Sequence, residues 1–160
     1  MNGLTRLANR ETAVVLSYGN AGTVDEWGIE FGSSMEITAA VTLSANYTWY
    51  NDAIRQNITG NVLVSNTPHN KGTVAADYAG AQGIDLGVDA RFIDAYPWAY
   101  GVWAGPIPAT QTVDVTGGYR VTPHLRAYIV ATDLLNQLRY QIYGGSVLSR
   151  RVLAGITSSF

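Results

Sequence analysis

Near its middle the chain reads Ile84-Asp85-Leu86-Gly87-Val88-Asp89-Ala90-Arg91-Phe92, and apolar residues alternate with polar residues or glycine throughout this stretch. Successive side chains of an extended chain point to opposite faces, so a period of two separates the residues into two rows. One row is apolar, and the other carries Asp85, Asp89 and Arg91. The pattern predicts a β-strand with one apolar face and one charged face.

The same period recurs along the chain. It is longest from Thr38 to Trp49, where the odd positions are apolar or aromatic and the even positions are small or polar. Several of these runs have the roughly 9 to 11 residues that a tilted strand needs to cross a bilayer. We expect strands at residues 24–34, 38–50, 70–79, 83–94, 109–119, 124–136 and 149–160.

The connections between these strands alternate in length. Short turns are expected at residues 33–37, 79–83 and 120–123, and longer loops at residues 51–70, 95–108 and 137–148. Outer-membrane barrels pair tight periplasmic turns with longer extracellular loops, and a periplasmic Phe160 puts every long loop outside the cell. The sequence therefore predicts an all-β fold: antiparallel up-and-down transmembrane β-barrel strands, seven or eight in number, that form a partial barrel.

The number of strands depends on the first segment. Apolar residues occupy even positions from Val14 to Tyr18 and odd positions from Trp27 to Phe31, so the phase shifts within residues 19–22. A hairpin there gives eight strands, which is enough to close a small barrel. A β-bulge there gives seven strands, and an odd number implies missing neighbours.

The N-terminal end carries no strand pattern of its own. We expect residues 1–11 to be a flexible N-terminal segment and residues 12–160 to be the barrel region. Residues 1–10 lack the apolar segment of a secretory signal, which an exported protein requires. The expectation is a carboxyl-terminal piece of a longer protein.

The composition fits a barrel wall. Charged residues make up 14% of the chain, against roughly 25% in soluble domains, so part of the surface is expected not to face water. Mean hydropathy is +0.03, because a lipid-facing row and a lumen-facing row cancel. No apolar run of about 18 residues exists to form a transmembrane helix. The net charge of −2 argues against nucleic-acid binding, and the absence of cysteine excludes disulfide scaffolds and thiolate zinc sites.

No group of residues forms a catalytic arrangement, and we expect neither an enzyme nor a cofactor. Ser146 and Ser149 lack a nearby histidine and acid that would activate a hydroxyl. His69 and His124 are expected on opposite sides of the membrane, so they do not predict a metal site.

Two groups of side chains are candidates for contact with a solute. Tyr96, Trp98, Tyr100 and Trp103 belong to an expected outer loop, where aromatic rings either stack on a ligand or anchor at the lipid interface; both interpretations are open.

The second candidate group is the inward row of Asp85, Asp89 and Arg91. Such a row either contacts a solute or solvates and cross-links the barrel interior, and the structural role is favoured. Tyr47, Trp49 and Tyr78 are interpreted as interfacial aromatics at the edge of the bilayer.

Several segments, in this order and spacing, resemble the end of the barrel in TonB-dependent outer-membrane receptors. The resemblance covers nearly the whole chain. Asp133 stands where this family usually has Asn, and Ser158 where an aromatic is common. The segments are Trp27-Gly28-Ile29-Glu30-Phe31, Ala45 to Ala53, Asn66-Thr67-Pro68-His69-Asn70-Lys71, Gly118 to Leu125, Asp133-Leu134-Leu135-Asn136 through Tyr140, and Gly144-Gly145 to Arg151.

The resemblance implies a receptor or transporter portion, located in the bacterial outer membrane, of a family that imports iron–siderophore complexes, vitamin B12 or similar scarce solutes. It implies contact with outer-membrane lipid and with the barrel-assembly machinery, which would recognise Ile156 and Phe160 in the terminal strand. TonB would be contacted only through a plug domain that has no counterpart in this chain.

Two alternatives stay open at the level of sequence. One is a self-contained eight-stranded outer-membrane barrel with a structural or adhesion role. The other is a soluble β-sandwich or lipocalin-like binder, whose apolar face would point inward.

Overall fold

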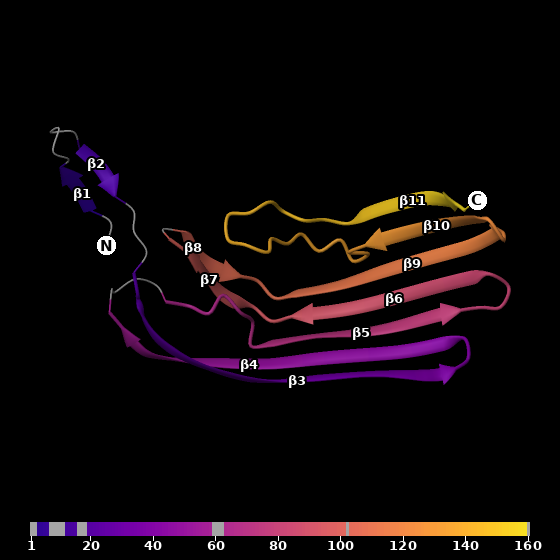
Figure 1. The fold of residues 1–160 in the computed structure, drawn as a ribbon, viewed down its shortest axis with the longest axis horizontal. Coiled ribbons are helices and arrows are strands. Elements are labelled where there is room, and N and C mark those ends of the chain that lie inside the picture. Colours follow the sequence, from indigo (N-terminus) through magenta and orange to yellow (C-terminus); the bar gives the residue numbers. More distant parts are fainter. Residues whose placement is uncertain (1–2, 7–11, 16–18, 59–62, 102, 160) are drawn as a thin grey trace.

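One seven-stranded antiparallel sheet dominates the fold (Figure 1). The computed structural model describes residues 3–6, 12–15, 19–58, 63–101 and 103–159. Within the sheet each strand lies beside the next one in the chain, so the predicted all-β, up-and-down antiparallel architecture is confirmed. Its strands are β3 (Gly22–Thr38), β4 (Val41–Asn57), β5 (Asn70–Ala79), β6 (Ile84–Ile93), β9 (Thr110–Thr122), β10 (Leu125–Thr132) and β11 (Arg151–Ser158).

Two small hairpins lie outside the main sheet. The first consists of β1 (Gly3–Arg6) and β2 (Thr12–Val15), which pair only with each other. Gly3–Arg6 is thus a paired strand inside the segment expected to be flexible. Of the two alternatives left open for residues 19–22, the structure does not support the hairpin, because β2 does not pair with β3, and the main sheet has seven strands.

The second hairpin is inserted between β6 and β9. Its strands are β7 (Tyr96–Tyr100) and β8 (Trp103–Ile107), so the prediction of a plain loop at 95–108 is wrong. Tyr96, Trp98 and Tyr100 alternate with Pro97 and Ala99, which is the strand period that the prolines and glycines of this region obscured.

Two turns show where the predicted boundaries differ from the structure. The turn expected at 33–37 is wrong, since β3 continues to Thr38 and the chain reverses at Ala39 and Ala40. The Ala40 N–H donates to Thr38 Oγ1 at 3.2 Å, and the His124 N–H donates to Thr122 Oγ1 at 3.3 Å after β9. A threonine at the end of a strand therefore supports both turns by accepting a bond from the residue two positions on.

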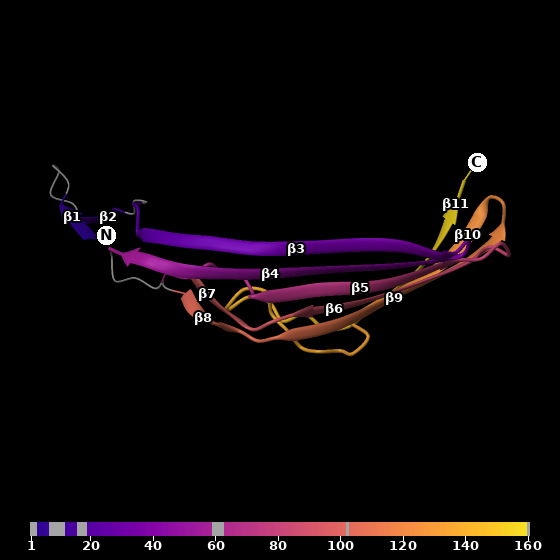
Figure 2. The same cartoon turned by 90° about the horizontal axis from the view of Figure 1, so that it is seen from below.

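The short turns lie at one end of the sheet and the long connections at the other (Figure 1). The turns after β3, β5 and β9 and the end of β11 share the first end, while the loops after β4, β6 and β10 share the second. The predicted asymmetry of the connections is confirmed. The sheet is curved rather than flat, as the turned view in Figure 2 shows.

Apolar side chains of neighbouring strands fall in register on one face. One row across the whole sheet is apolar in every strand, and most of its large side chains are exposed; Val88 is 43% exposed. We call this the apolar face. The row consists of Met35, Leu43, Ala76, Val88, Val115, Ala131 and Val152.

The neighbouring row, on the opposite face, is polar from β3 to β9 and becomes apolar only on β10 and β11. We call this the polar face. It consists of Glu36, Thr42, Asp77, Gly87, Thr116, Val130 and Leu153.

The described residues contain almost no hydrophobic core. Ala75 and Ile107 are the only buried apolar residues among them, and no second sheet covers the apolar face. A soluble β-sandwich would bury that face between two sheets, so the architecture does not support that alternative. Among the described residues there is no helix long and apolar enough to cross a membrane.

A lysine on the apolar face tests which solvent covers it. If lipid covers the apolar face, as the sequence predicts, Val88→Lys should strongly lower the yield of folded protein in outer membranes, because a lysine at the middle of a lipid-facing strand costs about 2–4 kcal/mol. The matched control is Thr116→Lys on the polar face, which should fold almost as well as wild type. Equal losses in heat-modifiable gel migration would contradict the assignment of the faces.

Candidate functional site

The β7–β8 hairpin gathers the four aromatic residues that the sequence singled out. Tyr96, Trp98 and Tyr100 alternate along β7, and Trp103 on β8 pairs with Tyr100, which places all four on one face of the hairpin. The Trp98 and Tyr100 ring centroids are 6.4 Å apart. Tyr100 and Trp103 are 69% and 62% exposed, so the tip of the hairpin presents aromatic surface to its surroundings.

A shallow groove of about 600 Å³ runs along the hairpin. Its lining is mostly apolar and combines two of these aromatic residues with small residues and prolines. The lining residues are Ala95, Tyr96, Pro97, Trp98, Ala104, Gly105 and Pro106.

The loop after β10 adds two tyrosines to this aromatic group, which the sequence reasoning missed. The Tyr143 ring lies directly on Gly105, where a Cβ atom would overlap the ring. Tyr140 meets Tyr143 edge to face at 6.5 Å, and its hydroxyl donates to the Pro106 carbonyl oxygen at 3.3 Å. Aromatic residues from two of the long connections, at the same end of the sheet, therefore form one cluster.

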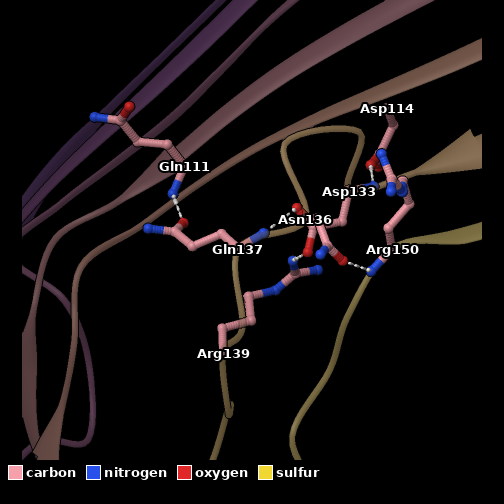
Figure 3. A network of polar contacts seen from close by, with 7 residues as sticks. All are labelled: Gln111, Asp114, Asp133, Asn136, Gln137, Arg139 and Arg150. Carbon is pink, nitrogen blue, oxygen red and sulfur yellow. Dashed lines mark hydrogen bonds and ion pairs between the residues drawn. The ribbon is translucent and has the colours of Figure 1, made fainter.

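A buried carboxylate organises the start of that loop (Figure 3). Asp133 follows β10 with a φ of 55°, a left-handed conformation that Asp tolerates, and it is only 1% exposed. Its N–H donates to Asp114 Oδ1 on β9 at 2.8 Å, and its Oδ2 accepts from Arg139 Nη1 at 2.6 Å. Because β10 stops here, the strand predicted to reach residue 136 is shorter than expected.

Further side-chain amides continue this network (Figure 3). The Gln137 N–H donates to Asp133 Oδ1 at 3.3 Å, and Gln137 Oε1 accepts from the Gln111 N–H at 2.8 Å. At the other end of the loop, the Arg150 N–H donates to Asn136 Oδ1 at 3.1 Å. The loop is thus tied to β9 at its beginning and closed on itself before β11.

The predicted inward row of β6, which consists of Asp85, Asp89 and Arg91, lies on the polar face. Of these three residues, only Asp85 forms an ion pair with another described residue. The Arg126 guanidinium on β10 binds both oxygens of Asp85, with Nε to Oδ1 at 3.1 Å. The contact crosses β9 at Gly118, where any Cβ would overlap the guanidinium. Asp85 therefore cross-links β6 to β10 across the intervening β9, while Asp89 lies opposite Asp114 in the β6–β9 ladder.

The remaining residues singled out by the sequence lie apart from this cluster. Tyr47 and Trp49 lie near the middle of β4, where Trp49 pairs with the first residue of β5, and Tyr78 lies on β5 toward the turn end. Opposite Trp49 is Asn70, eight residues before Tyr78, which is roughly 26 Å along a strand. Ile156 on β11 is 72% exposed.

Phe160 lies outside the described residues. His69 and His124 lie at opposite ends of the sheet, and the described part of the chain holds no group of three or more side chains suited to a metal ion.

Comparison with known proteins gives a family and a fold. The family model described as "TonB dependent receptor-like, beta-barrel" matches residues 2–134. Among curated proteins, no sequence matches the chain.

Several solved structures resemble the chain. The ferripyoverdine receptor of Pseudomonas aeruginosa is 18% identical, with a TM-score of 0.69. The aligned region covers 86% of this chain and 20% of that receptor. The ferric-catecholate import receptor Fiu of E. coli K12 is 17% identical, with a TM-score of 0.67, over 98% of this chain and 23% of that receptor. The siderophore receptor PiuA of Acinetobacter baumannii is 17% identical, with a TM-score of 0.67, over 99% of this chain and 24% of that receptor. At these identities the likeness shows the fold alone, and the chain spans less than a quarter of each of these proteins.

Removal of the buried carboxylate tests the network of Figure 3. We expect Asp133→Ala to cost about 3–5 kcal/mol of local stability in the loop after β10, because Arg139 loses its partner in a site where Asp133 is 1% exposed. Hydrogen exchange of residues 134–150 measures the cost. The matched control is Asp25→Ala, whose pair with Arg55 is exposed and contributes less than about 1 kcal/mol. Equal protection in both variants would contradict the role of Asp133.

Proposed function

Because the chain belongs to the TonB-dependent receptor β-barrel family, we propose that it forms part of the wall of an outer-membrane receptor that imports a scarce solute. The apolar face would contact lipid, and the polar face would line the interior. Tyr47, Trp49 and Tyr78 would mark the two edges of the bilayer, since their spacing along the strands is of the same order as an apolar band of about 25 Å. TonB would act through a plug domain, and the barrel-assembly machinery would recognise Ile156 and Phe160.

The aromatic cluster on the outer loops carries the proposal for the solute. Four residues of β7–β8 and two of the next loop offer flat apolar surface at the end of the sheet where the long loops gather. Flat rings stack favourably on planar or aromatic groups, and catecholate and pyoverdine-type siderophores present such groups. We therefore favour a ferric siderophore over vitamin B12 as the class of solute.

A binding assay with the full product of the gene tests this function. Outer-membrane vesicles that contain the protein are titrated with a panel of ferric catecholate, hydroxamate and pyoverdine-type siderophores and with vitamin B12. We expect saturable binding of one ferric siderophore and about tenfold weaker binding by Trp98→Ala, a loss of about 1.4 kcal/mol. Trp27→Ala is the matched control, because Trp27 lies on β3 and not in the cluster.

The same titration separates the two roles open for the hairpin aromatics. If Trp98→Ala binds as tightly as wild type, these rings do not contact the solute, and an anchor at the lipid interface is the better interpretation. If no member of the panel binds to the wild-type protein, the siderophore assignment is wrong.

A further inference from the structure

The side chain of Asn66, in the loop between β4 and β5, holds the backbone of β7. Asn66 Nδ2 donates to the Ala99 carbonyl oxygen at 3.0 Å, and Asn66 Oδ1 accepts from the Ala99 N–H at 2.8 Å. Both backbone groups of one residue are thereby satisfied by one side chain from 33 positions away. Ala99 lies between Trp98 and Tyr100, so the contact fixes the strand at the point from which both rings project.

The local backbone presents this amide to β7. Asn66 has a φ of 54°, in the left-handed region that Asn adopts more readily than most residues. The Thr67 hydroxyl donates to the Ser65 carbonyl oxygen at 3.0 Å, and the Ser65 hydroxyl donates to Asp52 Oδ1 at 3.3 Å. The bend at Asn66 is therefore tied back to β4 on its other side.

Only an amide matches this geometry. An Asn side chain carries one acceptor and two donor hydrogens, so it can pair with an N–H and a C=O at once, as a neighbouring strand would. An Asp side chain of the same shape would accept from the Ala99 N–H but would face the Ala99 carbonyl oxygen without a donor. Asn66 thus replaces a strand that β7 does not have on this edge.

The β7–β8 hairpin needs such support because it pairs with no other strand among the described residues. An isolated two-stranded hairpin is only marginally stable in water. At the outer edge of β8 the Tyr140 hydroxyl donates to the Pro106 carbonyl oxygen, and the Tyr143 ring covers Gly105 on the face that carries Trp98. One clamp on each flank holds the groove between two outer loops.

We propose that Asn66 is a positioning residue for solute binding, which holds the aromatic groove of β7–β8 in its binding shape before the solute arrives. The inference rests on the proposed function. A groove that forms only part of the time binds with an affinity reduced by the fraction of time that it is formed. Loss of the clamp should therefore weaken binding without removing any group that touches the solute.

The test combines hydrogen exchange with binding, again on the full gene product in outer-membrane vesicles. Asn66→Gly keeps the left-handed backbone and removes the amide, while Asn66→Asp keeps the shape and removes the donor. Both variants should raise the exchange rate of the peptide that contains Ala99 at least tenfold without solute. Both should raise the Kd for the ferric siderophore that wild type binds by a similar factor.

Thr38→Val is the control, because it also removes one hydroxyl hydrogen bond but in the turn at the opposite end of the sheet, and we expect less than a twofold change in either measurement. If the peptide that contains Ala99 exchanges at the wild-type rate in Asn66→Gly, then Asn66 does not hold β7 and the clamp is overturned. Faster exchange with an unchanged Kd would overturn the positioning role while leaving the clamp in place. A wild-type protein that binds no member of the panel would overturn the proposed function, and the exchange measurement would still decide whether Asn66 holds β7.

Discussion

The apolar face of a single-layered sheet must be covered by something apolar, and the rest of the structure follows from that requirement. Seven strands satisfy one another's backbone groups, yet their large apolar side chains are exposed and the described residues bury only Ala75 and Ile107 as apolar core. In water such a face would be a large liability, whereas a bilayer supplies the missing apolar layer. In the proposed receptor wall, hydrogen bonds within the sheet and lipid outside it would replace a folded core.

Without a core, the long loops at one end of the sheet have to be ordered by polar contacts. The structure uses two such devices, a buried carboxylate and a side-chain amide. Asp133 ties the loop after β10 to β9 and to Arg139, and Asn66 ties the loop after β4 to β7. Each adopts a left-handed backbone conformation. The Asn66 side chain contacts a segment distant in sequence, whereas Asp133 reaches β9 through its backbone N–H and its carboxylate accepts bonds from within its own loop. Together with the Tyr143 contact at Gly105, they bring the three long connections around one aromatic group.

The sequence predicted the sheet well because one physical rule governs it. A strand with lipid on one side and a polar interior on the other must alternate, and the stretch from Ile84 to Phe92 does so at every position. The rule is weaker where both rows are small or polar. Ser33 and Ser34 belong to the turn expected at residues 33–37, although they lie within β3.

The candidate site was only partly predictable for a different reason. Alternation of Tyr96, Trp98 and Tyr100 marks a strand, and the sequence identified these residues as candidates without showing the hairpin. The contacts that order them join residues far apart in the chain, 33 positions in the case of Asn66 and Ala99. Nothing in the local pattern around Asn66 shows which backbone its amide will meet, since that depends on how the sheet places the two loops.

Accessibility along β6 tests the central claim most directly, namely that one face of this sheet meets lipid and the other meets a polar interior. The chain has no cysteine, so single cysteines placed from Asp85 to Phe92 and labelled with nitroxide report each position separately. In outer-membrane vesicles, collision with oxygen should be high at Leu86, Val88 and Ala90, and collision with a water-soluble nickel complex should be higher at the positions between them. The same preference at both sets of positions, or the reverse alternation, would contradict the account.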